Sequence, residues 1–338
     1  MSKKPVMGLL YGDATGIGSE LIAKAIQDES VREKAHWVLI GDERIFKQGS
    51  EIANTEINYK SVKHISEIDR HANNVYLLHY PSLSPEDYEL GNVSALAGAA
   101  SGKLLTYAVD LAKDKLLDGI VYGPLNKDAL YKGGYLFEDD IHLLASLFDY
   151  KSGFGEINVM EDLWVTRATS HIPLKDVAEK ITKERVIEVI KFAEQNLKRA
   201  GFENPVIAVC ALNPHAGDGG LIGKEEIDII QPAIAEARDL GIQVEGPYPS
   251  DTVFLRLQKE QSFDCLLAMY HDQAQTGMKM LGFNKGVTVN GGLPVVLATP
   301  AHGTAHDIAG KGTANPGATI HAMKLAVKMV SEKSTLAR

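Results

Sequence analysis

The chain has 338 residues, with 35 Lys and Arg against 44 Asp and Glu, so its formal net charge is −9 at pH 7. This acidic balance argues against nucleic acid as the main partner, because nucleic-acid binding needs clustered Lys and Arg. No apolar run reaches the ~18 residues of a membrane span. The two cysteines, Cys210 and Cys265, lie in apolar runs and indicate buried thiols in a reducing compartment, so we expect a cytoplasmic protein.

Short apolar runs alternate with longer amphipathic stretches along the chain, which is typical of a largely parallel sheet covered by helices. We expect strands at Val6–Tyr11, Trp37–Ile40, Val75–Leu78, Gly119–Tyr122, Val206–Ala211, Leu266–Tyr270 and Val295–Ala298. We expect helices at Ile17–Gln27, Ser94–Asp114, Leu174–Glu179, Lys183–Arg199, Lys224–Leu240 and Thr319–Ser331. The pattern predicts an α/β protein of two lobes with a central cleft.

A glycine-rich segment, Gly12–Glu20, follows the first expected strand. Glycines permit a tight turn there, and free N–H groups at a helix start favour anions. The glycines fall at positions 12, 16 and 18, which fits neither the G-x-G-x-x-G dinucleotide fingerprint nor the Walker A loop. From the residues alone, the segment is either a binding loop or a structural turn.

Three histidines, His171, His215 and His271, each follow a strand-like run and lie among turn residues. Polar residues beyond the carboxyl ends of the strands of an α/β sheet tend to meet a ligand. Three imidazoles suit a divalent metal and leave positions open for substrate oxygens. The spacing is not that of a short-range metal motif, so three unrelated histidines that cap loops are the alternative.

Further segments carry candidate groups. The run from Thr299 to Pro316 is rich in small residues and precedes a helix, so it is either a ligand-binding loop or an irregular connection. Lys127 follows a strand and is either a cleft residue or a solvated lysine. Asp251 is either a helix cap or a catalytic carboxylate, and Asp140 is either a first-turn acidic residue or a substrate contact.

Together these segments resemble the 4-hydroxythreonine-4-phosphate dehydrogenase family of pyridoxal phosphate biosynthesis and its catabolic relatives. The resemblance rests on seven segments in the order of the family: GDATGIGSE, GPLNK, TSHIPL, LNPHAGDGGLIGKEE, PSDTVF, YHDQ and HGTAHDIAGKGTANP. The last segment also resembles the adenosine-binding loop of isopropylmalate and isocitrate dehydrogenases. The resemblance implies their α/β/α fold, with residues 1–128 and 295–338 forming a cofactor-side lobe and residues 129–294 forming a lobe for metal, substrate and dimerisation.

The resemblance also implies the chemistry. A secondary hydroxyl of a small hydroxy acid is oxidised by NAD or NADP, and the resulting β-keto acid loses CO₂. A divalent ion (zinc, cobalt, nickel, manganese or magnesium) is held by His171, His215 and His271, one of which comes from the second subunit of a homodimer with shared active sites. The cofactor-binding residues matched by the resemblance are Gly303, Thr304, Ala305, Asp307 and Asn315, and Lys279 matches a substrate-contacting lysine. Three residues are candidates for the general acid or base: Lys127, Asp251 and Asp272.

The chain departs from the phosphate-using members of the family at its substrate contacts. It has Asp139-Asp140-Ile141-His142 where they have Gly-His-Thr-Glu, and Thr288 and Leu297 where they have Asn and Arg. An arginine is a bidentate phosphate partner. Its loss beside Asp140 favours a phosphate-free hydroxy acid or a cyclic cis-dihydrodiol carboxylate over 4-phosphohydroxythreonine or a four-carbon sugar-acid phosphate. The rival classes are a ligand-binding homologue without turnover and a metal hydrolase, which leaves the HGTAHDIAG segment unexplained.

Overall fold

The computed structural model describes residues 4–260, 262–282 and 285–336. The chain divides into two compact units, unit 1 (Met1–Phe154 and Asn284–Arg338) and unit 2 (Gly155–Phe283). Residues 129–154 and 285–294, which the sequence predicts in the metal-side lobe, have their contacts in unit 1. The functional roles of the two lobes stay predictions.

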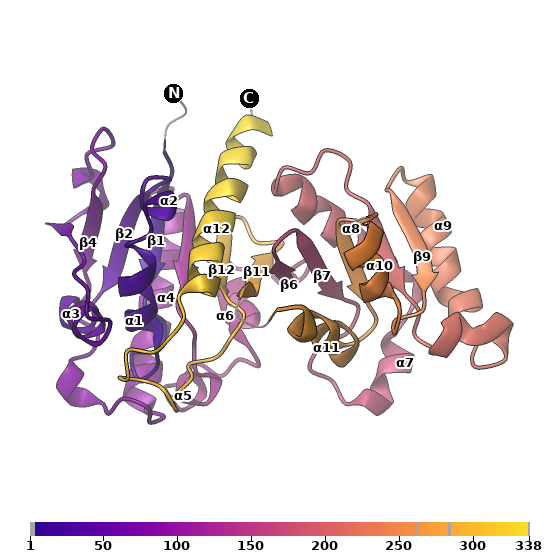
Figure 1. Cartoon of the computed structure of the whole chain (residues 1–338), viewed down its shortest axis with the longest axis horizontal. Coiled ribbons are helices and arrows are strands. Elements are labelled where there is room, and N and C mark those ends of the chain that lie inside the picture. Colours follow the sequence, from indigo (N-terminus) through magenta and orange to yellow (C-terminus); the bar gives the residue numbers. More distant parts are fainter. Residues whose placement is uncertain (1–3, 261, 283–284, 337–338) are drawn as a thin grey trace. The chain divides into compact units, whose positions relative to one another are not determined.

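Unit 1 is built on a mostly parallel sheet (Figure 1). Its strand order is β3-β4-β2-β1-β5-β12-β11, and β11 is antiparallel to its neighbour β12 whereas the other pairs are parallel. The central strands are buried along their whole length, which explains their unbroken apolar runs. The strands are β1 (Val6–Leu10), β2 (His36–Gly41), β3 (Tyr59–Val62), β4 (Val75–His79), β5 (Gly119–Tyr122), β11 (Val287–Gly291) and β12 (Val296–Pro300).

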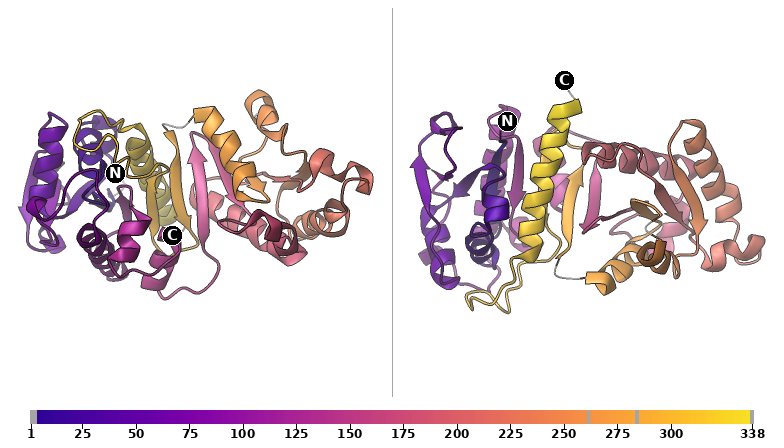
Figure 2. Two further views of the ribbon diagram at one scale, coloured as in Figure 1. Left: turned by 90° about the horizontal axis from the view of Figure 1, so that it is seen from below. Right: turned by 45° about the horizontal axis from the view of Figure 1, so that its top comes forward.

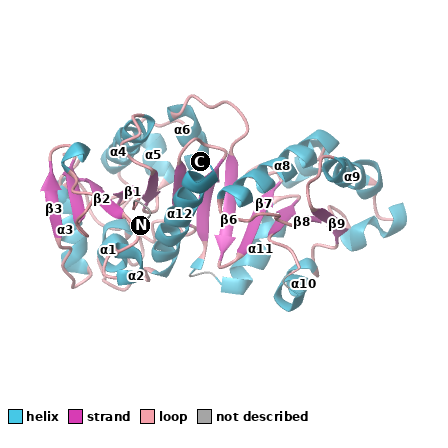
Figure 3. Cartoon of the chain, turned by 90° about the horizontal axis from the view of Figure 1, so that it is seen from above, coloured by secondary structure: helices cyan, strands magenta, loops and turns pink. Residues whose placement is uncertain are grey.

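Helices cover both faces of this sheet: α1, α3 and α12 lie on one side, and α4, α5 and α6 lie on the other (Figure 3). Figure 2 shows α12 running beside β12. Gly98 of α4 lets α5 approach closely, because a Cβ there would lie 1.8 Å from the carbonyl oxygen of Ala129. The helices are α1 (Gly18–Ala25), α2 (Glu29–Arg32), α3 (Glu43–Ile52), η1 (Ile65–Glu67), η2 (Pro85–Asp87), α4 (Ala95–Lys113), α5 (Lys127–Lys132), α6 (Asp140–Leu147) and α12 (Gly317–Leu336).

The strands of unit 2 are hydrogen-bonded in the order β6-β7-β10-β8-β9. The β6–β7 pair is antiparallel, and β7, β10, β8 and β9 are parallel to one another in that order. The carboxyl ends of these four strands therefore point to one edge of the sheet. The strands are β6 (Gly155–Met160), β7 (Leu163–Arg167), β8 (Ile207–Cys210), β9 (Val244–Tyr248) and β10 (Cys265–Ala268).

The helices of unit 2 also lie on both faces of their sheet, with α8 and α9 on one side and α10 and α11 on the other (Figure 3). The helix expected at Lys224–Leu240 is confirmed as a helical run over residues 225–239, and its first part is a π-helical turn over Glu226–Ile230 that leads into α9. Pro232 favours this π-helical turn, since it has no N–H for the ordinary helical bond to residue 228. The helices are η3 (Leu174–Asp176), α7 (Val177–Lys180), α8 (Lys183–Arg199), η4 (Pro214–Gly220), η5 (Glu226–Ile230), α9 (Gln231–Asp239), α10 (Val253–Glu260) and α11 (His271–Gly282).

Candidate metal and cofactor sites

The four parallel strands of unit 2 direct four candidate residues to the same edge of the sheet. His171 follows β7, His271 begins α11 after β10, His215 follows β8, and Asp251 follows β9. Because β7, β10, β8 and β9 are neighbours in this order, the loops that carry these residues are also neighbours.

Two of the three candidate metal ligands come together. The ring centroids of His171 and His271 are 5.6 Å apart, with an angle of 44° between the ring planes. Nδ1 of His271 lies 2.7 Å from Oδ1 of Asp272. Since an ionised carboxylate only accepts hydrogen bonds, Nδ1–H is the donor and Nε2 keeps its lone pair for a metal. With metal–nitrogen bonds of about 2.0–2.1 Å, two rings at this separation fit one ion.

His215 is not assembled with this pair within one chain. Among residues 4–260, 262–282 and 285–336, no group of three or more His, Cys, Asp or Glu side chains is placed to hold a metal ion. The backbone is strained at two of the three histidines, with φ of +41° at His171 and +54° at His215. Left-handed backbone at non-glycine residues costs about 1–3 kcal/mol per residue and is often found at functional sites.

Polar side chains that the sequence analysis did not single out fix these loops. Glu226 is 1% exposed, and its Oε1 accepts the N–H groups of Leu212 and Asn213, both at 2.8 Å. Gln273 bridges the ends of two strands, since its Oε1 accepts the Met269 N–H at 2.7 Å and its Nε2 donates to the Ala211 carbonyl at 2.8 Å. Glu226 lies in the π-helical turn that precedes α9, and such turns are frequent at functional sites.

Two candidate acid–base residues line one pocket of unit 2. Asp251 and Asp272 face a hollow of about 660 Å³ between α10 and α11, together with Tyr270. Lys279, the expected substrate contact, is exposed on α11, two helical turns beyond His271. The helical period places these two residues on one face. The third acid–base candidate, Lys127, is exposed at the first position of α5 in unit 1.

The expected cofactor loop of unit 1 packs against the glycine-rich segment that follows β1. The Ile17 N–H donates to the Thr304 carbonyl at 3.1 Å. A Cβ on Gly16 would lie 2.8 Å from the Thr304 side chain, so only glycine permits this approach. The hydroxyl of Thr15 lies 2.8 Å from Oδ1 of Asp13 and 3.2 Å from Nε2 of His306.

A charged clamp on α1 holds the distal part of the loop. Nζ of Lys24 donates to Oε1 of Glu20 at 2.7 Å and to the carbonyls of Gly312 and Ala314 at 2.8 Å. The same Glu20 oxygen accepts the Ala314 N–H at 2.8 Å. The loop is thus attached to the first helix along most of its length.

The five matched cofactor residues occupy different places in this loop. Gly303 and Asp307 are exposed, Thr304 is buried, and Ala305 has a φ of +45°. Asn315 caps α12, since its Oδ1 accepts the Gly317 N–H at 2.8 Å. The backbone at Gly303 is open, since a Cβ on this residue would have no atom of the described part of the chain within 4 Å. Such a position is suited to a ligand that lies on the main chain.

The residues that depart from the family at the substrate contacts lie in unit 1. Asp139 caps α6 and its Oδ1 lies 2.5 Å from Nδ1 of His142, so this carboxylate is already satisfied within the chain. Asp140 is half-buried at the first position of α6. Thr288 is half-buried in β11, and Leu297 is fully buried in β12.

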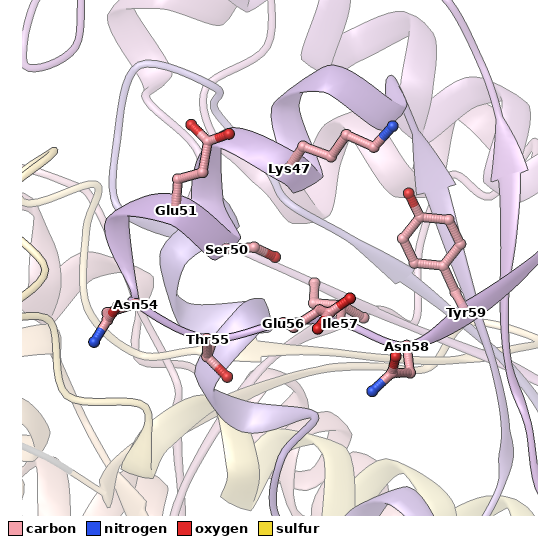
Figure 4. A pocket seen from close by; sticks show the side chains of 9 residues that line it. All are labelled: Lys47, Ser50, Glu51, Asn54, Thr55, Glu56, Ile57, Asn58 and Tyr59. Carbon is pink, nitrogen blue, oxygen red and sulfur yellow. The ribbon is translucent and has the colours of Figure 1, made fainter.

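A second hollow, of about 710 Å³, lies in unit 1 where α3 leads into β3 (Figure 4). Figure 4 shows Lys47, Glu51 and Tyr59 around it. None of the candidate site residues lines it.

Residues 33–326 match the family model described as "Pyridoxal phosphate biosynthetic protein PdxA". The chain belongs to the PdxA family. It is 44% identical over 332 residues, 98% of both chains, to a Pseudomonas aeruginosa protein provisionally named 4-hydroxythreonine-4-phosphate dehydrogenase 2. It is 37% identical over 334 residues, again 98% of both chains, to the D-threonate 4-phosphate dehydrogenase of Cupriavidus necator.

Solved structures give the same family. The 4-hydroxythreonine-4-phosphate dehydrogenase of Klebsiella pneumoniae has a TM-score of 0.85 and 32% identity, covering 97% of this chain and 98% of its own. A terephthalate 1,2-cis-dihydrodiol dehydrogenase of Burkholderia xenovorans has a lower TM-score of 0.66 and 25% identity, with 96% and 98% covered. The isocitrate dehydrogenase of Methylococcus capsulatus shares the fold only, with a TM-score of 0.51, 16% identity, and 98% and 88% covered.

These findings confirm the expected family and its α/β fold, and they make the relation to isocitrate dehydrogenases a distant one. Among the described residues, no helix has both the length and the apolar character needed to cross a membrane.

Proposed function

We propose that this protein is a metal-dependent dehydrogenase that uses NAD or NADP to oxidise a secondary hydroxyl of a four-carbon hydroxy acid bearing a 4-phosphate. The observation that carries the proposal is the His171–His271 pair, which lies at the carboxyl edge of the sheet of unit 2. The cofactor loop clamped to α1 supports a nicotinamide cofactor. The names of the relatives from Pseudomonas aeruginosa and Cupriavidus necator support a phosphorylated four-carbon substrate.

In this proposal His171, His215 and His271 hold the divalent ion. Such an ion acidifies a bound hydroxyl and stabilises negative charge on a neighbouring oxygen. Asp272 orients His271 through Nδ1, and Asp251, Asp272 or Lys127 moves the hydroxyl proton. Oxidation of a hydroxyl β to the carboxylate gives a β-keto acid, and we propose that it loses CO₂.

A homodimer belongs to the same proposal, since His215 does not join the other two histidines within one chain. Apolar side chains lie exposed beside its loop, with exposed fractions of 81% for Leu221, 40% for Ile222 and 43% for Ile227. Exposed apolar side chains next to a candidate ligand are suited to a second subunit that completes the ligand set.

An unphosphorylated hydroxy acid, such as a cis-dihydrodiol carboxylate, is the second candidate substrate. Leu297 is buried in β12 and offers no charge to a phosphate, and Asp140 brings a carboxylate to α6. A dianion needs cationic partners when it leaves water, so these two residues favour the second candidate.

Matched pairs of substrates test the two candidates. We expect 4-phosphothreonate or 4-phosphohydroxythreonine to support reduction of NAD or NADP, measured by the absorbance of the reduced cofactor. With the unphosphorylated acids we expect kcat/KM to be at least tenfold lower. A preference for the unphosphorylated member establishes the second candidate. CO₂ release in the same reaction tests decarboxylation, and the NAD/NADP ratio of kcat/KM gives the cofactor.

Removal of the metal tests the reaction class. We expect activity to vanish with a chelator and to return with added divalent ion, and to need the nicotinamide cofactor throughout. Metal-dependent cleavage of esters without cofactor would identify a hydrolase. Binding of cofactor and acid without turnover would identify a ligand-binding homologue.

A further inference from the structure

A chain of hydrogen bonds in unit 2 joins the two segments that carry His171 and His271. Asn158 of β6 is its centre, since Oδ1 of Asn158 accepts from Nη1 of Arg167 at 2.8 Å and from Nε2 of Gln275 at 2.7 Å. Asn158 and Arg167 are each 5% exposed, so these bonds are shielded from water.

Each end of this chain lies next to a candidate metal ligand. Nε of Arg167 donates to Oγ of Ser170 at 3.0 Å, and Ser170 immediately precedes His171. Gln275 lies one helical turn beyond His271 on α11, so both residues occupy one face of that helix. The hydrogen bonds thus connect a loop after β7 to a helix after β10 through a strand that carries neither histidine.

The positive charge of Arg167 is balanced by the carboxylate of Glu156. Its Nη2 lies 3.0 Å from Oε2 of Glu156, and the side chain of Arg167 is only 2% exposed. An unpaired buried guanidinium would repel a divalent cation at short range. Glu156 removes that repulsion while leaving the directional bonds of Arg167 intact.

We infer that Arg167, Asn158 and Gln275 are positioning residues that hold His171 and His271 at the separation which a shared divalent ion requires. The inference rests on the metal site proposed above. Side chains that orient metal ligands without touching the metal change affinity by about 10–100-fold when they are lost. The strained backbone at His171, with φ +41°, persists only where surrounding contacts hold it, and the Arg167–Ser170 bond is one such contact.

Cobalt binding tests the inference without reference to activity. Co²⁺ is titrated into the metal-free full chain, with visible absorption reporting coordination and a competing chelator giving the dissociation constant. We expect Gln275→Met to bind Co²⁺ about 10–100-fold more weakly than the wild type, with altered absorption bands. Asn158→Asp keeps an acceptor for both donors, and we expect it to bind nearly as the wild type does. Gln27→Met removes a comparable amide donor in unit 1 and is the control.

The outcomes separate the positioning role from the metal site itself. Wild-type affinity in folded Gln275→Met overturns the positioning role and leaves the metal site standing. Wild-type affinity in both His171→Ala and His271→Ala overturns the metal site and the positioning role with it. Should Gln275→Met fail to fold, Ser170→Ala removes only the last bond of the chain, and unchanged Co²⁺ affinity and spectrum in that variant overturn the inference.

Discussion

The carboxyl of Asp13 is an ionisable group at the centre of unit 1. It is 1% exposed, and its Oδ1 accepts the N–H and the hydroxyl of Thr15. Its Oδ2 has no hydrogen-bond partner among the residues that the structure describes. Burial raises the pKa of this carboxyl above its ordinary value of 3.8. The folded chain therefore binds the proton more tightly than the unfolded chain does, so protonation of Asp13 favours folding.

Asp13→Asn tests this shift through the pH dependence of stability. Asp13 in its ionised form opposes folding, so we expect the free energy of unfolding of the wild type, relative to Asp13→Asn, to be larger at about pH 4 than at about pH 7. Urea denaturation at both pH values measures it. Asp28→Asn is the control of opposite sign, because hydrogen bonds from Ser30 lower the pKa of Asp28 and its contribution is lost in acid. A difference for Asp13→Asn that does not vary with pH contradicts the shift.

The hydroxyl of Thr15 links Asp13 to His306 of the cofactor loop. Thr15→Val keeps the volume and removes the hydroxyl, which leaves a buried carboxylate with fewer donors. We expect the free energy of unfolding to fall by about 1–3 kcal/mol, measured by chemical denaturation. Thr106 is the matched control, because its hydroxyl donates to the Gly102 carbonyl within α4. Thr106→Val should change stability by less than about 1 kcal/mol. Equal losses in both variants would show that the link to His306 has no special weight.

At the scale of elements, the sequence predicts those helices and strands whose apolar residues repeat at the period of the element. The helix expected at Lys183–Arg199 has the same bounds as α8, because its apolar residues repeat at the helical spacing. Strands β9 and β11 were missed, since VEGPY and VTVNG carry Gly, Pro or polar residues that argue against a strand. The sequence does not predict helix α11 for a related reason, because HDQAQTGMKMLG is polar and contains Gly277. The structure requires this glycine, since a Cβ there would lie 2.4 Å from the Phe254 ring.

The candidate site was predictable only in part for physical reasons. Histidines that follow strands were visible as a pattern, and parallel pairing brings their loops to one edge. The bond between Asn158 and Gln275 joins residues 117 positions apart, and no local pattern predicts such a pairing. No local pattern predicts the role of Lys24 either. In the sequence it is an ordinary helical lysine, and only the folded chain brings the Gly312 carbonyl to its Nζ.

The clamp between α1 and the cofactor loop makes a prediction at this scale. Lys24→Met leaves Glu20, which is 1% exposed, without its cation and frees the carbonyls of Gly312 and Ala314. We expect about tenfold weaker binding of reduced nicotinamide cofactor by fluorescence titration and about 1–3 kcal/mol lower stability. Lys132→Met removes the lysine of an exposed pair with Asp128 and should change neither quantity measurably. Unaltered cofactor affinity in Lys24→Met would mean that the clamp does not shape the loop.

At the scale of the whole molecule, the two candidate sites belong to different units. The histidine pair lies in unit 2 and the clamped loop lies in unit 1. Each unit also contains one tryptophan, Trp37 in β2 and Trp164 in β7, and both are at most 2% exposed. Their fluorescence therefore reports the unfolding of one unit each.

This arrangement predicts that the two ligands stabilise different units. In Trp37→Phe the remaining Trp164 follows unit 2, and in Trp164→Phe the remaining Trp37 follows unit 1. A ligand at a hundred times its Kd stabilises the state that binds it by about 2.7 kcal/mol. In thermal unfolding we expect divalent metal to raise the midpoint temperature reported by Trp164 more than the one reported by Trp37. We expect reduced cofactor to raise the midpoint temperature reported by Trp37 more than the one reported by Trp164. Metal that raises only the Trp37 transition would contradict a metal site on the sheet of unit 2, and equal shifts at both probes would mean that the units unfold as one.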